Sequence, residues 1–560
     1  MTRKKRADDA THDRDDEEAR GGEVEPDEAD DRDDAEADHR HDAVEKDDWR
    51  PPQLSIRKTW ALATLSAILC PLGFAGFDYW PLAFVAWVPL ILAIRGQTPK
   101  RAALLGWYAG FAMTMIGFYW LVEMLEVFSG FPLPVCVLFA AILCAQKGGR
   151  IALCTWLYAR ASRRGWHPGL SFLGAFAVSE LIYPLLFPWY YAASMHTVPV
   201  MMQTADIGGV ILVSVVILAC NVAIAELLKK PIFKAEPDRR MVIGGLAAPL
   251  LALAYGAFRL SSVDAEVAAA ESIQVGIVQG NSPLKGRRDA LRKHIAMTKE
   301  LAPQVDLVVW SEAAASRSFD INRYERLTKQ RITRTLGVPT IVGLVVYERL
   351  KREPGSKGRT ARYFNTALMA DENGDIKGRY DKQFLLMFGE YLPFGDDLPV
   401  LYEWSPNSGS FSPGTSLAPL PFRDRRIATM ICYEDIIPSF VNELVDEGSP
   451  HLFVNMTNDA WFGDTIEPWQ HLALAKFRSI EHRRYMVRAT NSGVSAIIDP
   501  VGRTPQIGGT FVEQTLKGKV AFLEGSTIYG KTGNLPWWIV TGVMVLSAFV
   551  RRRQPGERAF

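Results

Sequence analysis

By hydropathy the chain divides into an apolar half, residues 55–260, and a mostly polar half that ends in one more apolar run. A helix needs ~20 apolar residues to cross the hydrocarbon core of a membrane. The runs at 102–122 and 207–225 reach this length, and the run at 241–258 comes close. Shorter or interrupted runs lie at 60–77, 81–94, 131–146, 170–187 and 535–550. The pattern predicts about seven transmembrane helices over 55–260 and an eighth over 533–552.

Lysine and arginine gather in every second loop between these runs. They precede the first run and follow the second, fourth, sixth and eighth, whereas residues 78–79, 123–130 and 188–206 contain none. Such residues are retained on the cytoplasmic side of short loops, so both termini are expected in the cytoplasm and residues 260–530 outside it. We assign Lys147, Arg150, Arg160, Arg163 and Arg164 to the loop after the fourth run.

Glu180 interrupts the fifth apolar run. A carboxylate inside a membrane span usually faces a partner or a cavity. Hydrogen bonding between helices and a functional role both remain open for it.

Residues 270–528 alternate short β-rich runs with helical segments, the pattern of an α/β domain. Strands are expected at 273–279, 306–310, 340–347, 365–370, 427–432, 452–456, 486–489 and 494–498. Helices are expected at 287–302, 324–336, 436–447 and 469–484. A domain of roughly 250 residues buries a full core.

The first 50 residues differ in composition from all that follow. They hold 10 Lys and Arg against 21 Asp and Glu, so the net charge of +1 hides −11 here and +12 in the remainder. With almost no large apolar groups the segment cannot bury enough surface to fold. We predict a disordered, acidic, cytoplasmic tail. A cleavable signal peptide is not evident, because the first apolar run begins only near Trp60.

Three runs of the polar domain lead into residues that suit acyl chemistry. The run 427–432 stops at Cys432, the run 306–310 leads to Glu312, and residues 378–381 lead to Lys382. Loops beyond the ends of parallel strands are where α/β sheets gather their sites. The three groups would supply a nucleophile, a base and a cation for an oxyanion. Amides of the helical turn after the cysteine would lower its pKa.

Cys432 is the one cysteine of six that lies in the polar half of the chain. A lone cysteine is more often inert packing than a nucleophile. Its position in a polar domain predicted to lie outside the cytoplasm favours a thiol whose reactivity is used.

Ordered motifs through this domain carry a family resemblance. They include Tyr-Asp-Lys at 380–382, Phe-Gly-Glu-Tyr-Leu-Pro at 388–393, Cys-Tyr-Glu at 432–434, Asn-Asp-Ala-Trp-Phe-Gly at 458–463 and Arg-Ala-Thr-Asn-Ser-Gly at 488–493. The domain resembles the nitrilase superfamily. With apolar runs on both flanks, the chain resembles its membrane-embedded family, the apolipoprotein N-acyltransferases. The resemblance implies a polytopic α-helical membrane domain joined to a nitrilase-like α-β-β-α sandwich over 270–528.

The resemblance also assigns roles to individual residues. It makes Glu312 the general base, Lys382 the oxyanion stabiliser and Cys432 the nucleophile, and its supporting positions are Glu390, Tyr433, Glu434 and Asn365. The family pattern is altered in three places. Ser311 stands where a proline usually precedes the base, Met387 replaces another proline, and a tryptophan usual near Gly286 is missing.

The activity that the resemblance implies is an acyl transfer in lipoprotein maturation at the bacterial inner membrane, with the catalytic domain on the periplasmic side. A phospholipid would donate its acyl chain to the cysteine as a thioester, and the N-terminal amine of a diacylated apolipoprotein would accept it. No metal or cofactor is implied, and we expect a monomer embedded in the lipid bilayer. Two alternatives stay open: a membrane-tethered nitrilase-type amidase, and a non-catalytic lipoprotein-binding membrane protein.

Residues 385–404 form a dense apolar and aromatic stretch beside Lys382, followed by Gly, Ser and Pro at 406–414. We hypothesise a mobile arm that dips into the membrane interface; the alternative is a loop folded over the domain's own core. The sequence has no Gly-x-Ser-x-Gly elbow and no P-loop. Its nine histidines lack metal-ligand spacing. The basic surplus flanks the apolar runs, so nucleic-acid binding is not expected.

Overall fold

The computed structural model describes residues 53–283, 289–315, 318–350, 360–395 and 409–552, together with Leu398, Val400 and Tyr402. All of them belong to one unit, residues 51–560. The predicted acidic tail, the position of Gly286 and residues 403–408 of the predicted arm lie outside the described residues.

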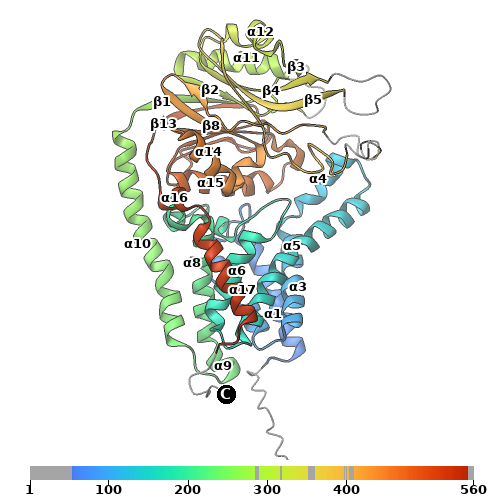
Figure 1. Ribbon diagram of the computed structural model, residues 1–560, viewed down its shortest axis with the longest axis vertical. Helices are drawn as coiled ribbons and strands as arrows, with labels where there is room; N and C mark the ends of the chain where they lie inside the picture. The colour runs from blue at the N-terminus through green and yellow to red at the C-terminus, as the bar shows by residue number, and fades with distance from the viewer. Residues whose placement is uncertain are drawn as a thin grey trace, which may run out of the picture. The chain divides into compact units, whose positions relative to one another are not determined.

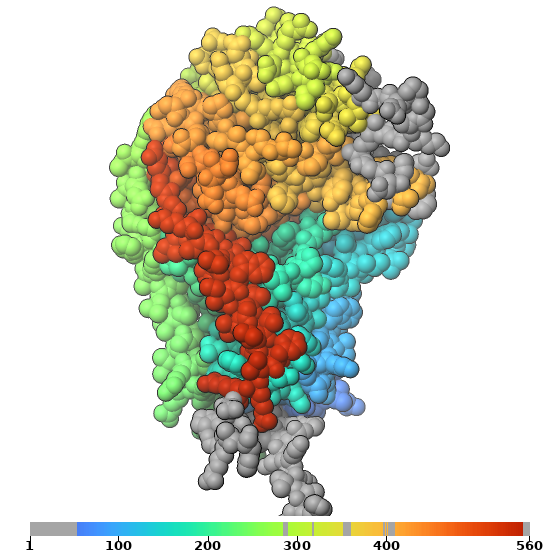
Figure 2. All heavy atoms as spheres, viewed as in Figure 1, coloured from blue at the N-terminus to red at the C-terminus, as the bar shows by residue number. Residues whose placement is uncertain are grey.

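Each predicted apolar run lies on a helix. The helices are α1 (Ile56–Leu72), α2 (Val88–Ile94), α3 (Pro99–Gly117), α5 (Leu133–Ser162), α6 (Pro168–Ile182), α8 (Ala205–Leu227), α10 (Arg239–Ala269) and α17 (Leu535–Phe549). The last of them packs against α5 and α6 (Figures 1 and 2). Among the described residues α5, α8 and α10 are long and apolar enough to cross a membrane. The pair α3 and α4 (Trp120–Ser129), bent by 68°, makes a possible fourth span, and the count of eight stays a prediction.

The prediction that a loop begins directly after the fourth run, at Lys147, is wrong. Helix α5 continues to Ser162, so Lys147 and Arg150 lie inside the helix and are buried. Lys147 Nζ donates to the carbonyl of Phe187 at 2.8 Å, and Arg150 donates to that of Trp189 at 2.6 Å. Pattern alone placed both cations in water, whereas each is hydrogen-bonded inside the protein; Nε and Nη2 of Arg150 stay without a hydrogen-bond partner among the described residues. Arg160 lies in the last turn of the helix, and Arg163 and Arg164 follow its end, so the alternation of basic loops persists.

Residues 272–521 form two sheets packed face to face. The first has the order β13-β1-β2-β4-β5-β6 with β3 beside β4, and the second β12-β11-β10-β9-β8-β7. Their strands are β1 (Ser272–Gln279), β2 (Leu307–Trp310), β3 (Ser318–Asp320), β4 (Thr340–Arg349), β5 (Ala361–Ala370), β6 (Ile376–Asp381), β7 (Leu420–Phe422), β8 (Arg425–Ile431), β9 (Leu452–Thr457), β10 (Met486–Thr490), β11 (Ala496–Ile498), β12 (Gln506–Ile507) and β13 (Gln514–Ala521).

Helices cover the outer faces of both sheets (Figure 1). On the first sheet they are α11 (Ala290–Leu301) and α12 (Tyr324–Arg331), and on the second α14 (Pro438–Gly448) and α15 (Glu467–His482). Side chains alternate between two cores, as the period of a strand requires. In β2, Val309 faces the second sheet while Val308 and Trp310 pack toward α11. The predicted α-β-β-α sandwich is confirmed.

Helix α15 connects the sandwich to the helices that precede it. Gln470 accepts from Trp120 Nε1 at 3.0 Å, and Arg483 pairs with Asp206 of α8 at 2.6 Å. Helix α8 is broken at Gly208 and Gly209, and the freed backbone N–H of Val210 donates to Glu481 of α15 at 2.9 Å. The break in the helix is therefore satisfied by the catalytic domain.

Candidate active site

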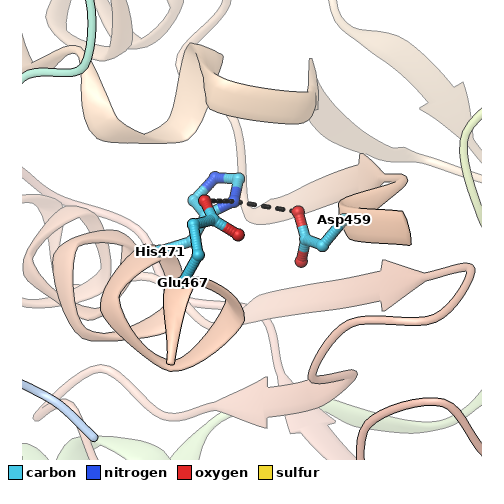
Figure 3. A group of neighbouring side chains, drawn as sticks. All are labelled: Asp459, Glu467 and His471. Carbon is cyan, nitrogen blue, oxygen red and sulfur yellow. Dashed lines mark hydrogen bonds and ion pairs between the residues drawn. The ribbon is translucent and has the colours of Figure 1, made fainter. Parts of the chain in front are cut away.

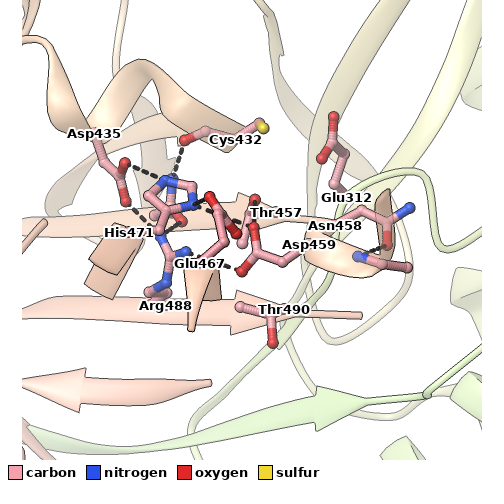
Figure 4. A network of polar contacts seen from close by, with 12 residues as sticks. Glu312, Cys432, Asp435, Thr457, Asn458, Asp459, Glu467, His471, Arg488 and Thr490 are labelled. Carbon is pink, nitrogen blue, oxygen red and sulfur yellow. Dashed lines mark hydrogen bonds and ion pairs between the residues drawn. The ribbon is translucent and has the colours of Figure 1, made fainter. Parts of the chain in front are cut away.

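Cys432 directly follows β8 and begins the short 3-10 turn η5 (Cys432–Ile436). Its φ of +56° lies in the left-handed region, which residues with a side chain rarely occupy. Backbone strain of this kind gathers at functional sites. Asn455 holds the turn by donating to the Cys432 carbonyl at 2.9 Å. The thiol points to the side of the turn on which Glu312 lies (Figure 4).

Lys382 and Glu312 follow β6 and β2, two strands whose carboxyl ends lie at the same edge of the first sheet. Lys382 Nζ lies 2.7 Å from Glu390 Oε2 and 3.9 Å from Glu312 Oε1. Asn365 of β5 donates to both carboxylates, at 2.6 Å to Glu312 and 3.2 Å to Glu390. The ammonium is buried between two carboxylates that one amide holds in place.

Electrostatics sets the protonation of these groups. Burial raises the pKa of Glu312 to about 7, against the opposing charge of Lys382. Burial alone would lower the pKa of Lys382, but Glu390, Cys432 and Glu312 together raise it well above its usual value. The lysine therefore stays cationic, while the Glu312 carboxyl group changes charge near neutral pH. Such a group is poised to accept and return a proton.

The expected lowering of the thiol pKa is not found. Burial raises the pKa of Cys432 well above its usual value, and Lys382 opposes this only in part. The cysteine is followed by a single 3-10 turn, and helix α14 begins only at Pro438. The N-terminal amides of a full helix are therefore not aimed at the sulfur. The thiol needs a base to give up its proton, and Glu312 is the group beside it.

Glu434 and Tyr433 support the site from behind the cysteine. Glu434 accepts hydrogen bonds from the backbone N–H groups of Ile431, Gln383 and Phe384 and from the Tyr380 hydroxyl, at 2.6–3.0 Å. It thereby joins the segment after Lys382 to the turn that carries Cys432. The Tyr433 hydroxyl donates to the carbonyl of Leu385 at 3.1 Å, and its ring lies 5.6 Å from Lys382 Nζ.

Cys432 lines an open, mostly apolar cavity. Its walls are mostly aromatic and aliphatic, and they come from both the preceding helices and the sandwich. Besides Cys432 and Tyr433, the lining includes Phe74, Phe118, Trp120, Phe187, Trp189, Leu386, Ile436, Phe462 and Leu474. Apolar walls next to a nucleophile suit a ligand that carries hydrocarbon chains.

Sequence reasoning missed a buried ionic network behind the cysteine. Arg488 of β10 donates to Asp435 at 2.6 Å, to Asp459 at 3.2 Å and to the Asn455 side chain that holds the Cys432 carbonyl (Figure 4). The available signal was Arg488, a charged residue inside an apolar strand. It was noted as part of a motif, but no role was assigned to it. The network connects the nucleophile's turn to the ends of β9 and β10.

Asp459, Glu467 and His471 bring three metal-ligand side chains together (Figure 3). His471 Nε2 lies 2.9 Å from Asp435 and Nδ1 lies 3.1 Å from Asp459. Burial and Arg488 disfavour the charged ring, but these two carboxylates outweigh them and raise the pKa of His471 to about 10. The geometry is that of an ion-pair network.

The described part of the predicted arm is mixed in character. Leu386 and Leu392 are buried, whereas Phe388 and Phe394 are exposed by 55% and 73%. The exposed rings agree with the arm hypothesis and the buried leucines with the folded loop. Trp404 lies outside the described residues, so the hypothesis stays a prediction.

Family comparisons agree with this geometry. Residues 66–223 match the model of the apolipoprotein N-acyltransferase N-terminal domain, and residues 274–523 match the carbon-nitrogen hydrolase model. Apolipoprotein N-acyltransferases of Geobacter metallireducens and Pseudomonas aeruginosa are each 32% identical to this chain. Each alignment covers 89% of this chain, together with 96% of the Geobacter protein and 97% of the Pseudomonas protein. The chain belongs to the apolipoprotein N-acyltransferase family. The resemblance predicted from the motifs is thus confirmed, and with it an acyltransferase of the nitrilase superfamily.

Solved structures that resemble the chain cover about half of it. A carbon-nitrogen hydrolase superfamily protein of Xanthomonas campestris is 17% identical, with a TM-score of 0.34. The match covers 51% of this chain and 100% of the Xanthomonas chain. A nitrilase-superfamily protein of Saccharomyces cerevisiae is 15% identical, with 48% and 95% covered and a TM-score of 0.33.

Proposed function

We propose that the chain acylates the N-terminal amine of diacylated apolipoproteins with an acyl chain taken from a membrane phospholipid, through a thioester on Cys432. The observation that carries this proposal is that Cys432 lines an apolar cavity and lies within the electrostatic reach of Glu312 and Lys382, which are 3.9 Å apart. Family membership supplies the acceptor class, and the geometry supports the donor and the covalent intermediate.

In the first step Glu312 takes the proton of the Cys432 thiol, and the sulfur attacks the ester carbonyl carbon of the phospholipid. The Lys382 ammonium is placed to stabilise the oxyanion. Collapse breaks the ester C–O bond, and the leaving oxygen takes the proton back from Glu312. The products are a lysophospholipid and an acyl thioester.

In the second step the α-amine of the lipidated cysteine attacks the thioester carbon. Glu312 accepts the amine proton and returns it to the sulfur as the C–S bond breaks. An amide and the free thiol result. Splitting the transfer in this way replaces one difficult displacement by two easier ones.

The cavity favours lipid substrates over those of a tethered amidase. A hydrolase needs a single anchor, whereas here aromatic residues from the junction between α3 and α4, from α4 and from the loop after α6 line the space beside the nucleophile. A bound acyl chain buries its methylene groups there, each with about 0.8 kcal/mol of transfer free energy. A non-catalytic binding protein would not need the buried Lys382 and its two carboxylates.

Intact mass spectrometry tests the thioester. Purified protein incubated with phospholipid vesicles should gain the mass of one acyl group, and neutral hydroxylamine should remove it. Cys432→Ala should gain nothing, and an adduct on that variant would overturn the proposal. Adding a diacylated lipopeptide should move the label to the peptide amine; release as free fatty acid would instead favour the amidase.

The setting of the reaction is also part of the proposal. The alternation of basic loops supports a multi-pass protein of the bacterial inner membrane with the sandwich on the periplasmic side. We keep the monomer as the expected state.

A further inference from the structure

Glu467, the first residue of α15, lines the same cavity as Cys432. It is only 6% exposed, and its Oε2 is buried without a hydrogen-bond partner. Its other oxygen lies 4.0 Å from His471 Nδ1, beyond hydrogen-bond distance. Buried polar atoms are nearly always paired, so an unpaired one in the wall of a cavity indicates a group that a ligand completes.

The polar side chains next to Glu467 are already engaged. Gln470 accepts from Trp120 and donates to the carbonyl of Gly117. Both nitrogens of His471 contact carboxylates. Glu467 is therefore the neighbour with hydrogen-bonding capacity to spare.

Charge balance shows which form of Glu467 faces the cavity. Asp435 and Asp459 offset His471 and Arg488 in the buried network. A further anion would have no counter-charge. Burial, reinforced by Asp459, raises the pKa of Glu467 well above its usual value. The side chain is accordingly a carboxylic acid, which donates a hydrogen bond.

We propose that Glu467 is a substrate-binding residue whose carboxylic acid donates a hydrogen bond from Oε2 to an ester carbonyl oxygen of the bound lipid. The inference rests on the proposed function, which puts an acyl ester beside Cys432. The remaining cavity wall is mostly hydrocarbon and aromatic rings, which hold chains but do not orient an ester. An ammonium ligand would instead require a carboxylate at this position.

Kinetics of single variants in nanodiscs test the inference. Glu467→Gln keeps a donor, so its KM for phospholipid should stay within about threefold of wild type. Glu467→Leu removes the donor and should raise KM by roughly tenfold with little change in kcat, the range of one neutral hydrogen bond. Glu447→Leu, the same change at an exposed site on α14, is the matched control. Equal losses in the Gln and Leu variants would overturn the donor role.

An ether lipid distinguishes a carbonyl contact from a general packing defect. A dialkyl ether phospholipid has the chains and headgroup but no carbonyl oxygen, so it should inhibit wild type and Glu467→Leu equally. A parallel loss of ether-lipid inhibition, or an unchanged KM in Glu467→Leu, would refute the inference. Where the leucine variant does not fold, Glu467→Met takes its place. Absence of any acyl adduct on wild type would instead refute the proposed function.

Discussion

At the scale of single residues, the same buried environment keeps the cation charged and brings the pKa of the base close to neutral. Glu312 and Lys382 are both removed from water, yet the lysine is held charged by Glu390 while Glu312 titrates near neutrality. The thiol, whose pKa burial raises, depends on that base. The sulfur is therefore the nucleophile, and the Glu312 carboxyl group controls when it is deprotonated.

Glu312 gives the reaction a pH dependence whose sign follows from its pKa. Only the carboxylate accepts the thiol proton, so kcat/KM should rise with pH through about 7 and fall roughly tenfold per unit below it. Glu312→Gln should lower kcat by about 10²–10⁴-fold and remove this limb. Stopped-time acyl transfer from pH 5.5 to 8.5 measures both, with exposed Glu325→Gln as control. A full acid limb in Glu312→Gln would assign the titration to another group.

Sequence reasoning predicted the seven residues of this site because each lies at a strand end or inside a motif. It missed Asn455 and Arg488, which lie within apolar strands and act through contacts distant in sequence. It also misjudged the thiol, since the length of the turn after Cys432 is set by tertiary packing. The site roles themselves stay predictions until variants are measured.

At the scale of elements, β4 positions the base through close backbone approach. A Cβ on Gly343 would lie 2.3 Å from the Ser311 carbonyl and 2.9 Å from the Ala313 amide, the residues on both sides of Glu312. Gly343→Ala should therefore shift that turn and lower kcat by about 10²-fold, since misplacement by about 1 Å has such an effect. The thermal midpoint should fall by only a few degrees.

The matched control for this change is Gly244→Ala, where the new methyl group meets nothing within 4 Å. Acyl transfer and thermal unfolding of both variants check the prediction. Wild-type activity in Gly343→Ala would show that the Glu312 turn tolerates displacement.

Helix α15 shows why pattern alone predicts an element but not its surroundings. Its helical span was predicted to within two residues at each end. The pattern did not predict that Arg478, Glu481 and Arg483 are buried against α8 and the loops before it. The edge strand β13 was not predicted at all, because polar residues recur along its exposed half.

The pair of Arg483 with Asp206 should carry much of this packing. Asp206→Ala leaves a buried guanidinium short of its counter-charge, and breaking such a pair costs about 3–5 kcal/mol. The double variant with Arg483→Met should recover part of the loss, because it removes the stranded charge. Thermal unfolding in nanodiscs measures both, with exposed Asp446→Ala as control. A double variant less stable than Asp206→Ala would contradict a charge-pair origin.

At the scale of the whole molecule, the apolar half and the sandwich make one reaction space. The cavity has walls from helices that precede residue 200 and a nucleophile at residue 432. Apolar pattern predicted where the helices lie, but the buried Lys147 and Arg150 show that charge alone does not end a span. The predicted sidedness depends on the lysines and arginines that cluster at the ends of the helices, not on the two buried ones.

That sidedness predicts opposite accessibility for two exposed sites. Lys100→Cys, in the first turn of α3, should react with a membrane-impermeant maleimide only in inverted vesicles, and Asp446→Cys on α14 only in intact spheroplasts. The background is Cys432→Ser, because the other five cysteines are buried. Labelling of both sites only in inverted vesicles would contradict the alternation argument and place the sandwich in the cytosol. The lipid donor would then have to come from the inner leaflet, because the thiol cavity opens beside the helices on the sandwich side.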